Sequence, residues 1–303
     1  MQPAHMLVST GARSALRWTV VAVAVAALVG ACAPPPGQGG NGGTSSPPVC
    51  GGGPQDPAHG RIVETNYGSG PFSGVNIYPA CGSKARGTVM YVHGGGYTGG
   101  SRYEGGWGPV QALRQLGWAV VSIDYPLSPF AQWPEHRNGV QQAITWWRNT
   151  GAARYSLPAY PLVGAGWSAG GQLVEFVNLK GNGPTFDAAI SVSGSTYWPD
   201  RNTTEAAVTL FGPVFTQAHW LLVDSSSLTH LDPNDPPLLH VHGRNDGIVA
   251  ASQAELLRDA IADGRGDPAR HNVIIDPTCG HSVGCLTKER FSSFVDPLFG
   301  TGG

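Results

Sequence analysis

An apolar run that leads directly into a Gly-x-Ser-x-Gly turn most constrains how this chain can fold. Residues 161–165 form the run, and the five residues from Gly166 to Gly170 read Gly-Trp-Ser-Ala-Gly. A helix-compatible stretch, Gln172 to Lys180, comes next. A strand that turns sharply into a helix around a serine leaves no room for side chains two residues before and after that serine. The pattern therefore predicts that Ser168 stands on a tight strand-to-helix turn.

The start of the chain has the pattern of an export signal. Arg13 and Arg17 precede an uncharged run, Trp18 to Ala31, and small residues stand directly before Cys32. The run is shorter than the roughly 20 residues that cross a bilayer, but it suits a signal-peptide core. Small residues before a cysteine resemble the bacterial lipobox, so we expect residues 1–31 to be a lipoprotein-type signal and Cys32 to be lipidated. A plain secretory signal is the alternative.

Composition divides the rest of the chain in two. Residues 32–58 are rich in Pro, Gly and Ser and have too few apolar side chains to pack, which predicts a flexible tether. Residues 59–303 are then one folded domain. A net charge of -2, with 13% charged residues, gives no sign of a nucleic-acid partner. We expect an exported protein at the outer face of a bacterial membrane, held there through its lipid anchor only, or else secreted; the pattern gives no oligomeric state.

The cysteines beyond residue 32 are even in number, as is typical of disulfides in an oxidising compartment. Three pairings are possible, and we favour Cys50–Cys81 and Cys279–Cys285. The second pairing would close a short loop around His281 and stabilise it by about 2 kcal/mol. A Cys/His metal site is the alternative, but the spacing matches no common zinc pattern. We therefore expect no metal.

Short apolar runs alternate with helix-compatible segments along the predicted domain. Runs without polar interruption are typical of parallel strands covered on both faces, and the alternation predicts an α/β fold with a mostly parallel central sheet flanked by helices. Residues 196–236 are aromatic-rich and stand where a small lid could cover a site. Strands are expected at 61–66, 74–78, 88–92, 119–124, 162–165, 188–192, 238–242 and 272–276, and further helices at 110–116, 134–150, 253–262 and 286–295.

A glycine triplet follows one of these strands directly. The residues are His93, Gly94, Gly95 and Gly96. Glycines let main-chain N–H groups turn toward a reacting carbonyl without a Cβ in the way. Gly95 and Gly96, together with the N–H of Ala169, are therefore candidate oxyanion donors. His93 is expected to orient the loop; a purely structural turn is the alternative.

A serine nucleophile requires an acid and a base from elsewhere in the chain. Asp246 is the best candidate acid because it follows the strand at 238–242, at the carboxyl end. Asp235 precedes that strand, at the wrong end. Asp124 ends an earlier strand, where a structural role is expected.

The base is expected on the loop after the last strand, where His281 is the only histidine. His240 and His242 alternate along an apolar strand and are expected to point into the packing. The remaining candidates precede a strand or lack a matching motif, and they are His271, His136, His219 and His230.

The chain order of these motifs resembles that of the α/β-hydrolase superfamily. Ser168, Asp246 and His281 follow one another as nucleophile, acid and base, with the His-Gly-Gly-Gly run ahead of them. That run and the residues Asp124-Tyr125-Pro126-Leu127-Ser128-Pro129 resemble the hormone-sensitive-lipase-like and feruloyl-esterase-like carboxylesterases. The resemblance covers residues 88–295.

Two positions depart from that family's pattern. Trp167 stands where lipase-like members commonly have aspartate, and Pro126 stands where they commonly have arginine. Little of the predicted domain precedes the first strand, so there is little room for the N-terminal cap of those members.

Residues and resemblance together imply a serine carboxylic-ester hydrolase that acts through an acyl-enzyme on a small or sugar-linked ester. Ser168 would attack the ester carbonyl, His281 would take its proton, and Asp246 would orient the imidazole. No cofactor is expected. A peptidase or polyester hydrolase on the same fold is one alternative, and a catalytically silent, lipid-anchored binding module is another.

Overall fold

The computed structural model describes residues 63–82, 84–103, 107–199, 210 and 219–300. The predicted signal, the lipidation site Cys32 and the tether lie outside these residues, as do residues 200–209 and 211–218 of the predicted lid segment. Their boundaries at residues 31 and 58 therefore stay predictions. Within the described ranges, no helix combines the length and the apolarity that a membrane crossing requires.

The described residues build an eight-stranded sheet with the order β1-β2-β4-β3-β5-β6-β7-β8. β1 pairs antiparallel with β2 and β2 antiparallel with β4, and every other neighbouring pair is parallel. This confirms the expected fold class. The strands are β1 (Val63–Asn66), β2 (Gly74–Tyr78), β3 (Thr88–Val92), β4 (Ala119–Ile123), β5 (Leu162–Trp167), β6 (Ala188–Val192), β7 (Leu238–Gly243) and β8 (His271–Asp276).

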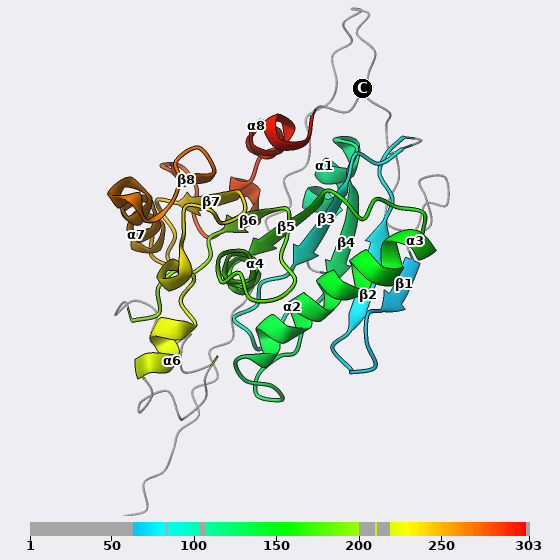
Figure 1. Cartoon of the computed structure of the whole chain (residues 1–303), viewed down its shortest axis with the longest axis horizontal. Coiled ribbons are helices and arrows are strands. Elements are labelled where there is room, and N and C mark those ends of the chain that lie inside the picture. The colour runs from blue at the N-terminus through cyan, green and yellow to red at the C-terminus, as the bar shows by residue number, and fades with distance from the viewer. Residues whose placement is uncertain (1–62, 83, 104–106, 200–209, 211–218, 301–303) are drawn as a thin grey trace, which may run out of the picture. The chain divides into compact units, whose positions relative to one another are not determined.

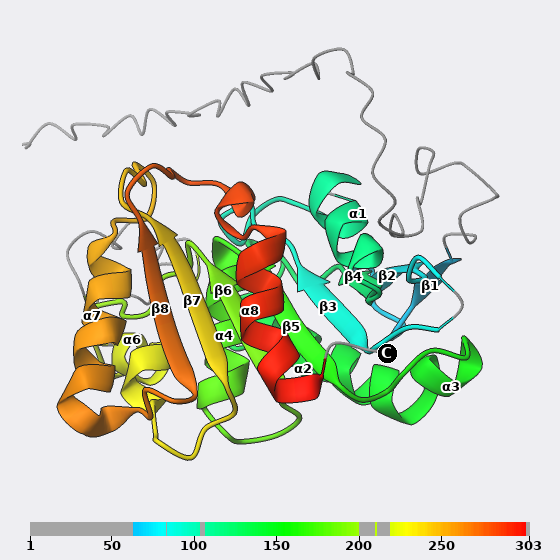
Figure 2. The same cartoon turned by 90° about the horizontal axis from the view of Figure 1, so that it is seen from above.

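Helices cover both faces of this sheet. Figure 1 shows the sheet between the two helix layers, and in Figure 2 α8 lies in front of the strands and α4 behind them. The helices are α1 (Trp107–Gln115), α2 (Glu135–Trp146), α3 (Ala152–Arg154), α4 (Ala169–Leu179), α6 (His219–Asp224), α7 (Ser252–Ala260) and α8 (Lys288–Phe299). Short 3-10 turns span Ser227–His230 and Val283–Cys285, and π-helical turns span Trp147–Gly151 and Ile261–Arg265.

Two apolar layers hold these helices to the sheet. One layer joins α2, α4 and α7 to the sheet through buried side chains such as Val140, Leu173 and Leu257. The other joins α1 and α8 to the opposite face through Leu113 and Phe291. Because both faces of the sheet are covered, β3, β4 and β6 are buried along their whole length and do not alternate between buried and exposed residues.

One predicted helix differs from the structure. The sequence pattern predicts a single helix over 134–150, whereas α2 ends at Trp146 and a π-helical turn follows to Gly151. The wider turn accompanies a fully buried Trp147, whose indole N–H donates to the Pro158 carbonyl at 3.2 Å. Periodicity alone carries no information about such a local change in winding.

The parallel strands bring their carboxyl ends to one edge of the sheet. His93 follows β3, Asp124 follows β4, Ser168 follows β5, and Asp246 lies on the loop after β7. His281 lies on the loop after β8. In open α/β sheets this edge is where ligands bind.

The turn from β5 into α4 depends on close backbone packing. A methyl group on Gly166 would lie 2.2 Å from the Gly170 carbonyl oxygen. A methyl group on Gly170 would lie 2.1 Å from the Val92 carbonyl oxygen. Both distances are far below any normal contact, so the two glycines of the motif are sterically required.

We predict that Gly166→Ala lowers the free energy of unfolding by about 1–3 kcal/mol or more, since the backbone must shift to admit the methyl group. Gly70→Ala is the matched control, because nothing lies within 4 Å of a methyl group there. It should change stability by less than about 1 kcal/mol. Urea unfolding measures both values, and a Gly166→Ala protein as stable as the parent would contradict the packing argument.

Candidate active site

Ser168 stands on the turn between β5 and α4 with an unusual backbone. Its φ is 56° and its ψ is -120°, a conformation that residues other than glycine rarely adopt. The Ser168 N–H donates to the Val192 carbonyl at 2.8 Å, which fixes the turn against β6. This backbone conformation, which the absence of side chains on Gly166 and Gly170 permits, places the Ser168 hydroxyl at the carboxyl edge of the sheet.

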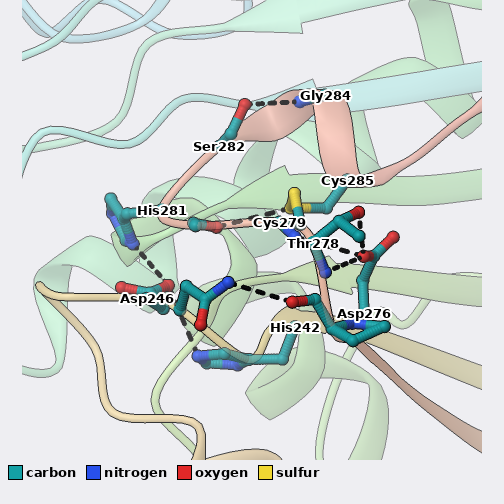
Figure 3. Close-up of a disulfide and its surroundings, with 12 residues drawn as sticks. His242, Asp246, Asp276, Thr278, Cys279, His281, Ser282, Gly284 and Cys285 are labelled. Carbon is teal, nitrogen blue, oxygen red and sulfur yellow. Dashed lines mark hydrogen bonds and ion pairs between the residues drawn. A yellow bond between two sulfur atoms is a disulfide. The ribbon is translucent and has the colours of Figure 1, made fainter.

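The hydroxyl of Ser168 meets an imidazole, and the imidazole meets a carboxylate. Ser168 Oγ lies 3.0 Å from His281 Nε2, and His281 Nδ1 lies 2.8 Å from Asp246 Oδ2. The Asp246 side chain has no exposed surface, and that of His281 is 14% exposed. Figure 3 shows the His281–Asp246 contact. The structure thus brings the predicted nucleophile, base and acid into one hydrogen-bonded series.

Asp246 is held as a carboxylate. Burial opposes its ionisation, but hydrogen bonds from His281 and from two main-chain N–H groups outweigh burial and lower the Asp246 pKa below its usual value. Those N–H groups belong to Ile248 and Val249 and donate to Oδ1 at 2.9 and 2.8 Å. A carboxylate can only accept, so Nδ1 of His281 carries a proton and Nε2 is free to accept from Ser168.

The glycine loop after β3 lies beside the serine turn. The Gly95 carbonyl accepts from the N–H groups of Thr98 and Gly99, and Gly95 and Gly96 have φ values of 105° and 58°. Within the part of the chain that the structure describes, the N–H groups of Gly95, Gly96 and Ala169 donate to no protein acceptor. Ala169 is the first residue of α4, where a main-chain N–H has no partner inside the helix.

His93 lies beneath this loop rather than at its surface. Its ring is buried, stacks on Tyr125 at 4.3 Å between centroids, and contacts the Gly94 carbonyl through Nδ1 at 2.7 Å. The Tyr125 hydroxyl donates to the His93 carbonyl at 3.1 Å. Burial lowers the pKa of His93, so its ring is neutral. These contacts fit the loop-orienting role expected for His93.

Asp124 has a structural partner. It forms an ion pair with Arg102 and accepts the Arg102 main-chain N–H at 2.6 Å. Arg102 also donates to Asn76 of β2 at 2.9 Å. Asp124 therefore fastens the far end of the glycine loop to the sheet, as expected. Asp235, the other rejected acid, binds the main-chain N–H of Asp232 in a separate turn.

The loop that carries His281 is fixed at both ends. Cys279 and Cys285 form a disulfide, as predicted, with 6.0 Å between their Cα atoms (Figure 3). Asp276 accepts from Thr278 and from the Cys279 N–H, and it pairs with Arg290 of α8. Hydrogen bonds from Thr278, followed by those from Arg290, hold the Asp276 pKa well below its usual range.

Only one of the two cysteines in the predicted Cys50–Cys81 disulfide lies within the described residues. Cys81 is disulfide-bonded, but Cys50 lies outside the described residues. That pairing stays a prediction.

Trp167 is a site neighbour for which the sequence left two roles open, lining the substrate pocket or packing in the core. Its ring lies 5.2 Å from the His281 ring, and a methyl group on Gly94 would lie 2.8 Å from the indole. The side chain thus fills the space between the base and the glycine loop. Its place directly before the nucleophile is the signal that could have identified it.

His240 and His242 are buried, as expected, but they do not simply pack. His240 Nδ1 lies 2.6 Å from Glu175 Oε2, and His240 Nε2 lies 3.1 Å from His242 Nδ1. Sequence reasoning missed Glu175 entirely. The signals were a lone carboxylate within the apolar α4 and two histidines on one face of β7.

The other histidines have separate partners. His136 lies 3.1 Å from the Ser128 hydroxyl, His230 lies 2.6 Å from the Asp224 carbonyl, and His271 accepts from the Asp267 N–H. Among the described residues, no group of three His, Cys, Asp or Glu side chains could hold a metal ion.

The order of strands, helices and site residues along the chain matches a known fold. A mostly parallel sheet between two helix layers has a serine on the turn after β5, with an acid after β7 and a histidine after β8. The described residues therefore have the fold of α/β-hydrolase esterases.

Sequence comparisons identify more particular relatives. Residues 75–215 match the family BD-FAE. Esterase LipC of Mycobacterium tuberculosis is 29% identical over 220 residues, which are 65% of this chain and 54% of LipC. The probable carboxylic ester hydrolase LipM of the same organism is 26% identical, over 66% of this chain and 51% of LipM. The chain thus spans about half the length of these relatives.

Solved structures share the fold at lower sequence identity. A truncated carbohydrate esterase from gut microbiota has a TM-score of 0.69 and 21% identity, covering 79% of this chain and 95% of its own. Esterase 2 of Thermogutta terrifontis, phosphonylated by sarin, has a TM-score of 0.67 and 16% identity, covering 80% and 96%.

We predict that replacing both Cys279 and Cys285 by serine lowers the free energy of unfolding by about 2 kcal/mol, because the loop around His281 loses its closure. Chemical denaturation measures the change. Reductant should lower the stability of the parent more than that of the double variant, since both proteins retain the Cys81 disulfide. Equal stability of parent and double variant would contradict the prediction.

Proposed function

We propose that this protein is a serine hydrolase of carboxylic esters that works through an acyl-enzyme. The observation that carries the proposal is the series from Ser168 Oγ to His281 Nε2 at 3.0 Å and from His281 Nδ1 to Asp246 Oδ2 at 2.8 Å. Nucleophile, base and orienting acid within hydrogen-bond reach are what this chemistry requires.

Proton transfer in the proposed mechanism follows the fixed polarity of the series. His281 Nε2 takes the hydroxyl proton as Ser168 Oγ attacks the ester carbonyl, and the imidazolium then gives that proton to the leaving alcohol. Asp246 stabilises the imidazolium and keeps its proton on Nδ1. Water, activated by the same imidazole, hydrolyses the acyl-enzyme and restores Ser168.

The developing oxyanion would be held by main-chain donors. Gly95, Gly96 and Ala169 supply N–H groups without a protein acceptor in the described residues, and they flank the serine turn. Loss of one such donor typically removes about 3 kcal/mol of transition-state stabilisation. The positive φ values of Gly95 and Gly96 explain why glycine stands at both positions.

We propose a small or sugar-linked ester as the substrate class. The carbohydrate esterase among the structural neighbours supports a sugar-linked ester. The names of LipC and LipM support ester hydrolysis in general.

Ser168→Ala is predicted to lower kcat/KM toward short p-nitrophenyl esters by at least about a thousandfold, because the acyl-enzyme cannot form. Ser69→Ala, at an exposed position in the turn between β1 and β2, is the matched control and should retain full activity. Initial rates across acyl lengths, with acetylated and feruloylated sugars included, would also identify the preferred ester. A Ser168→Ala protein with undiminished activity would rule out the mechanism.

We further propose that the protein is exported and lipid-anchored through Cys32. The apolar run that ends in small residues before this cysteine supports the proposal. In detergent phase separation, the parent should enter the detergent phase and Cys32→Ala should not. Cys50→Ser, which retains Cys32, is the matched control and should behave as the parent. Equal partitioning of Cys32→Ala and the parent would refute lipid attachment at this residue.

A further inference from the structure

A chain of buried polar side chains continues from Asp246 away from the serine. His242 Nε2 lies 3.4 Å from Asp246 Oδ2, and His240 Nε2 lies 3.1 Å from His242 Nδ1. Glu175 Oε2 lies 2.6 Å from His240 Nδ1. None of these four side chains has any exposed surface. Figure 3 shows Asp246 between His281 and His242, so the acid has a histidine on each side.

The four side chains of this buried series lie on the same elements that carry the site. Glu175 lies on α4, two turns beyond Ser168, and both histidines lie on β7, which leads into the loop of Asp246. The two imidazoles are nearly parallel, with 4° between their planes and 5.4 Å between centroids. Spacing of two residues along a strand places both rings on one face of the sheet.

The Val249 carbonyl fixes the direction of the hydrogen bonds within this buried series. His242 Nε2 lies 2.9 Å from that carbonyl oxygen, which can only accept, so the proton of His242 is on Nε2. Burial, followed by the neighbouring His240, lowers the pKa of His242 to about 4, so the ring is neutral at pH 7. Its Nδ1 therefore has a lone pair and must accept from His240 Nε2–H.

Glu175 is the last member of this buried series, at the end away from Asp246. Because His240 donates through Nε2, the 2.6 Å contact between its Nδ1 and Glu175 Oε2 must hold one further proton. The Ser227 hydroxyl donates to the other Glu175 oxygen at 2.5 Å. Every member thus has a partner, as buried polar groups require.

We propose that Glu175, His240 and His242 are positioning residues that hold the acid loop, and through it Asp246, in the geometry that orients His281. This inference rests on the proposed serine hydrolase function. His242 binds the Val249 carbonyl, while the Val249 N–H binds Asp246 Oδ1 at 2.8 Å. The main chain of Val249 is therefore held on one side by His242 and on the other by Asp246. The Nε2–H of His242 also faces Asp246 Oδ2.

His242→Leu removes the donor to Val249 at little change in volume and should lower kcat by about ten- to a hundredfold, the usual effect of a small misplacement near the reacting groups. KM should change less than about threefold, because no substrate contact is lost. His242→Gln retains an N–H donor at similar reach and should restore most of the activity. Glu175→Gln retains a donor to His240 and an acceptor for Ser227, so its kcat should stay within about threefold of the parent.

Coupling to the acid separates positioning from general structural damage. In an Asp246→Asn background, His242→Leu should lower kcat less than about threefold further, because its effect acts through Asp246. Circular dichroism and thermal unfolding establish that each variant is folded. A full multiplicative loss in that background, or an unchanged kcat in His242→Leu, would overturn the proposal while ester hydrolysis by the parent stands.

The position of the proton on the His242 ring can be measured in the parent protein itself, without an activity assay or a variant. In nitrogen-15 NMR of the parent with labelled histidine, His242 should show a protonated Nε2 and a bare Nδ1. The proton on Nδ1 instead would overturn the proposal. A parent without any ester hydrolysis would defeat the proposed function itself and the positioning role with it.

Discussion

The contact between Ser168 and His281 is the constraint on which the rest of this structure depends. The two residues are 113 positions apart in the sequence, and Ser168 Oγ lies 3.0 Å from His281 Nε2. Three separate loops must end at the same sheet edge for this to occur. The parallel register of β5 through β8 achieves that placement, and the disulfide between Cys279 and Cys285 limits how far the base loop can move.

Helix α4 does more than cover the sheet. Its polar side chains at positions 172, 175 and 178 lie on one stripe and bind loop carbonyls, β7 and the segment before β7. The residue before the helix is the proposed nucleophile, so one element fixes both Ser168 and the side chain that closes the histidine chain. Of these three side chains, Glu175 reaches the histidines next to the acid, and both of its carboxylate oxygens have a partner. A buried carboxylate without those partners would cost free energy, so this contact is specific.

The sequence predicted what depends on local pattern and chain order. Ser168, Asp246 and His281 could be selected because each stands at the carboxyl end of a recognisable apolar strand, and the strand limits were mostly accurate. Glu175 and the histidines of β7 could not be understood in that way. Their partners come from different elements, and an alternating His-x-His on an apolar strand gives no indication of what lies opposite. The π-helical turn after α2 was invisible for a similar reason, since it arises with the packing of Trp147.

Mass spectrometry after treatment with a fluorophosphonate tests the central claim most directly. Such a probe bonds covalently only to a serine whose hydroxyl has been activated by a base. We predict one modified peptide, with the adduct on Ser168, and no adduct when His281 is replaced by alanine. Absence of any adduct on the native protein, or an adduct on a different serine, would contradict it.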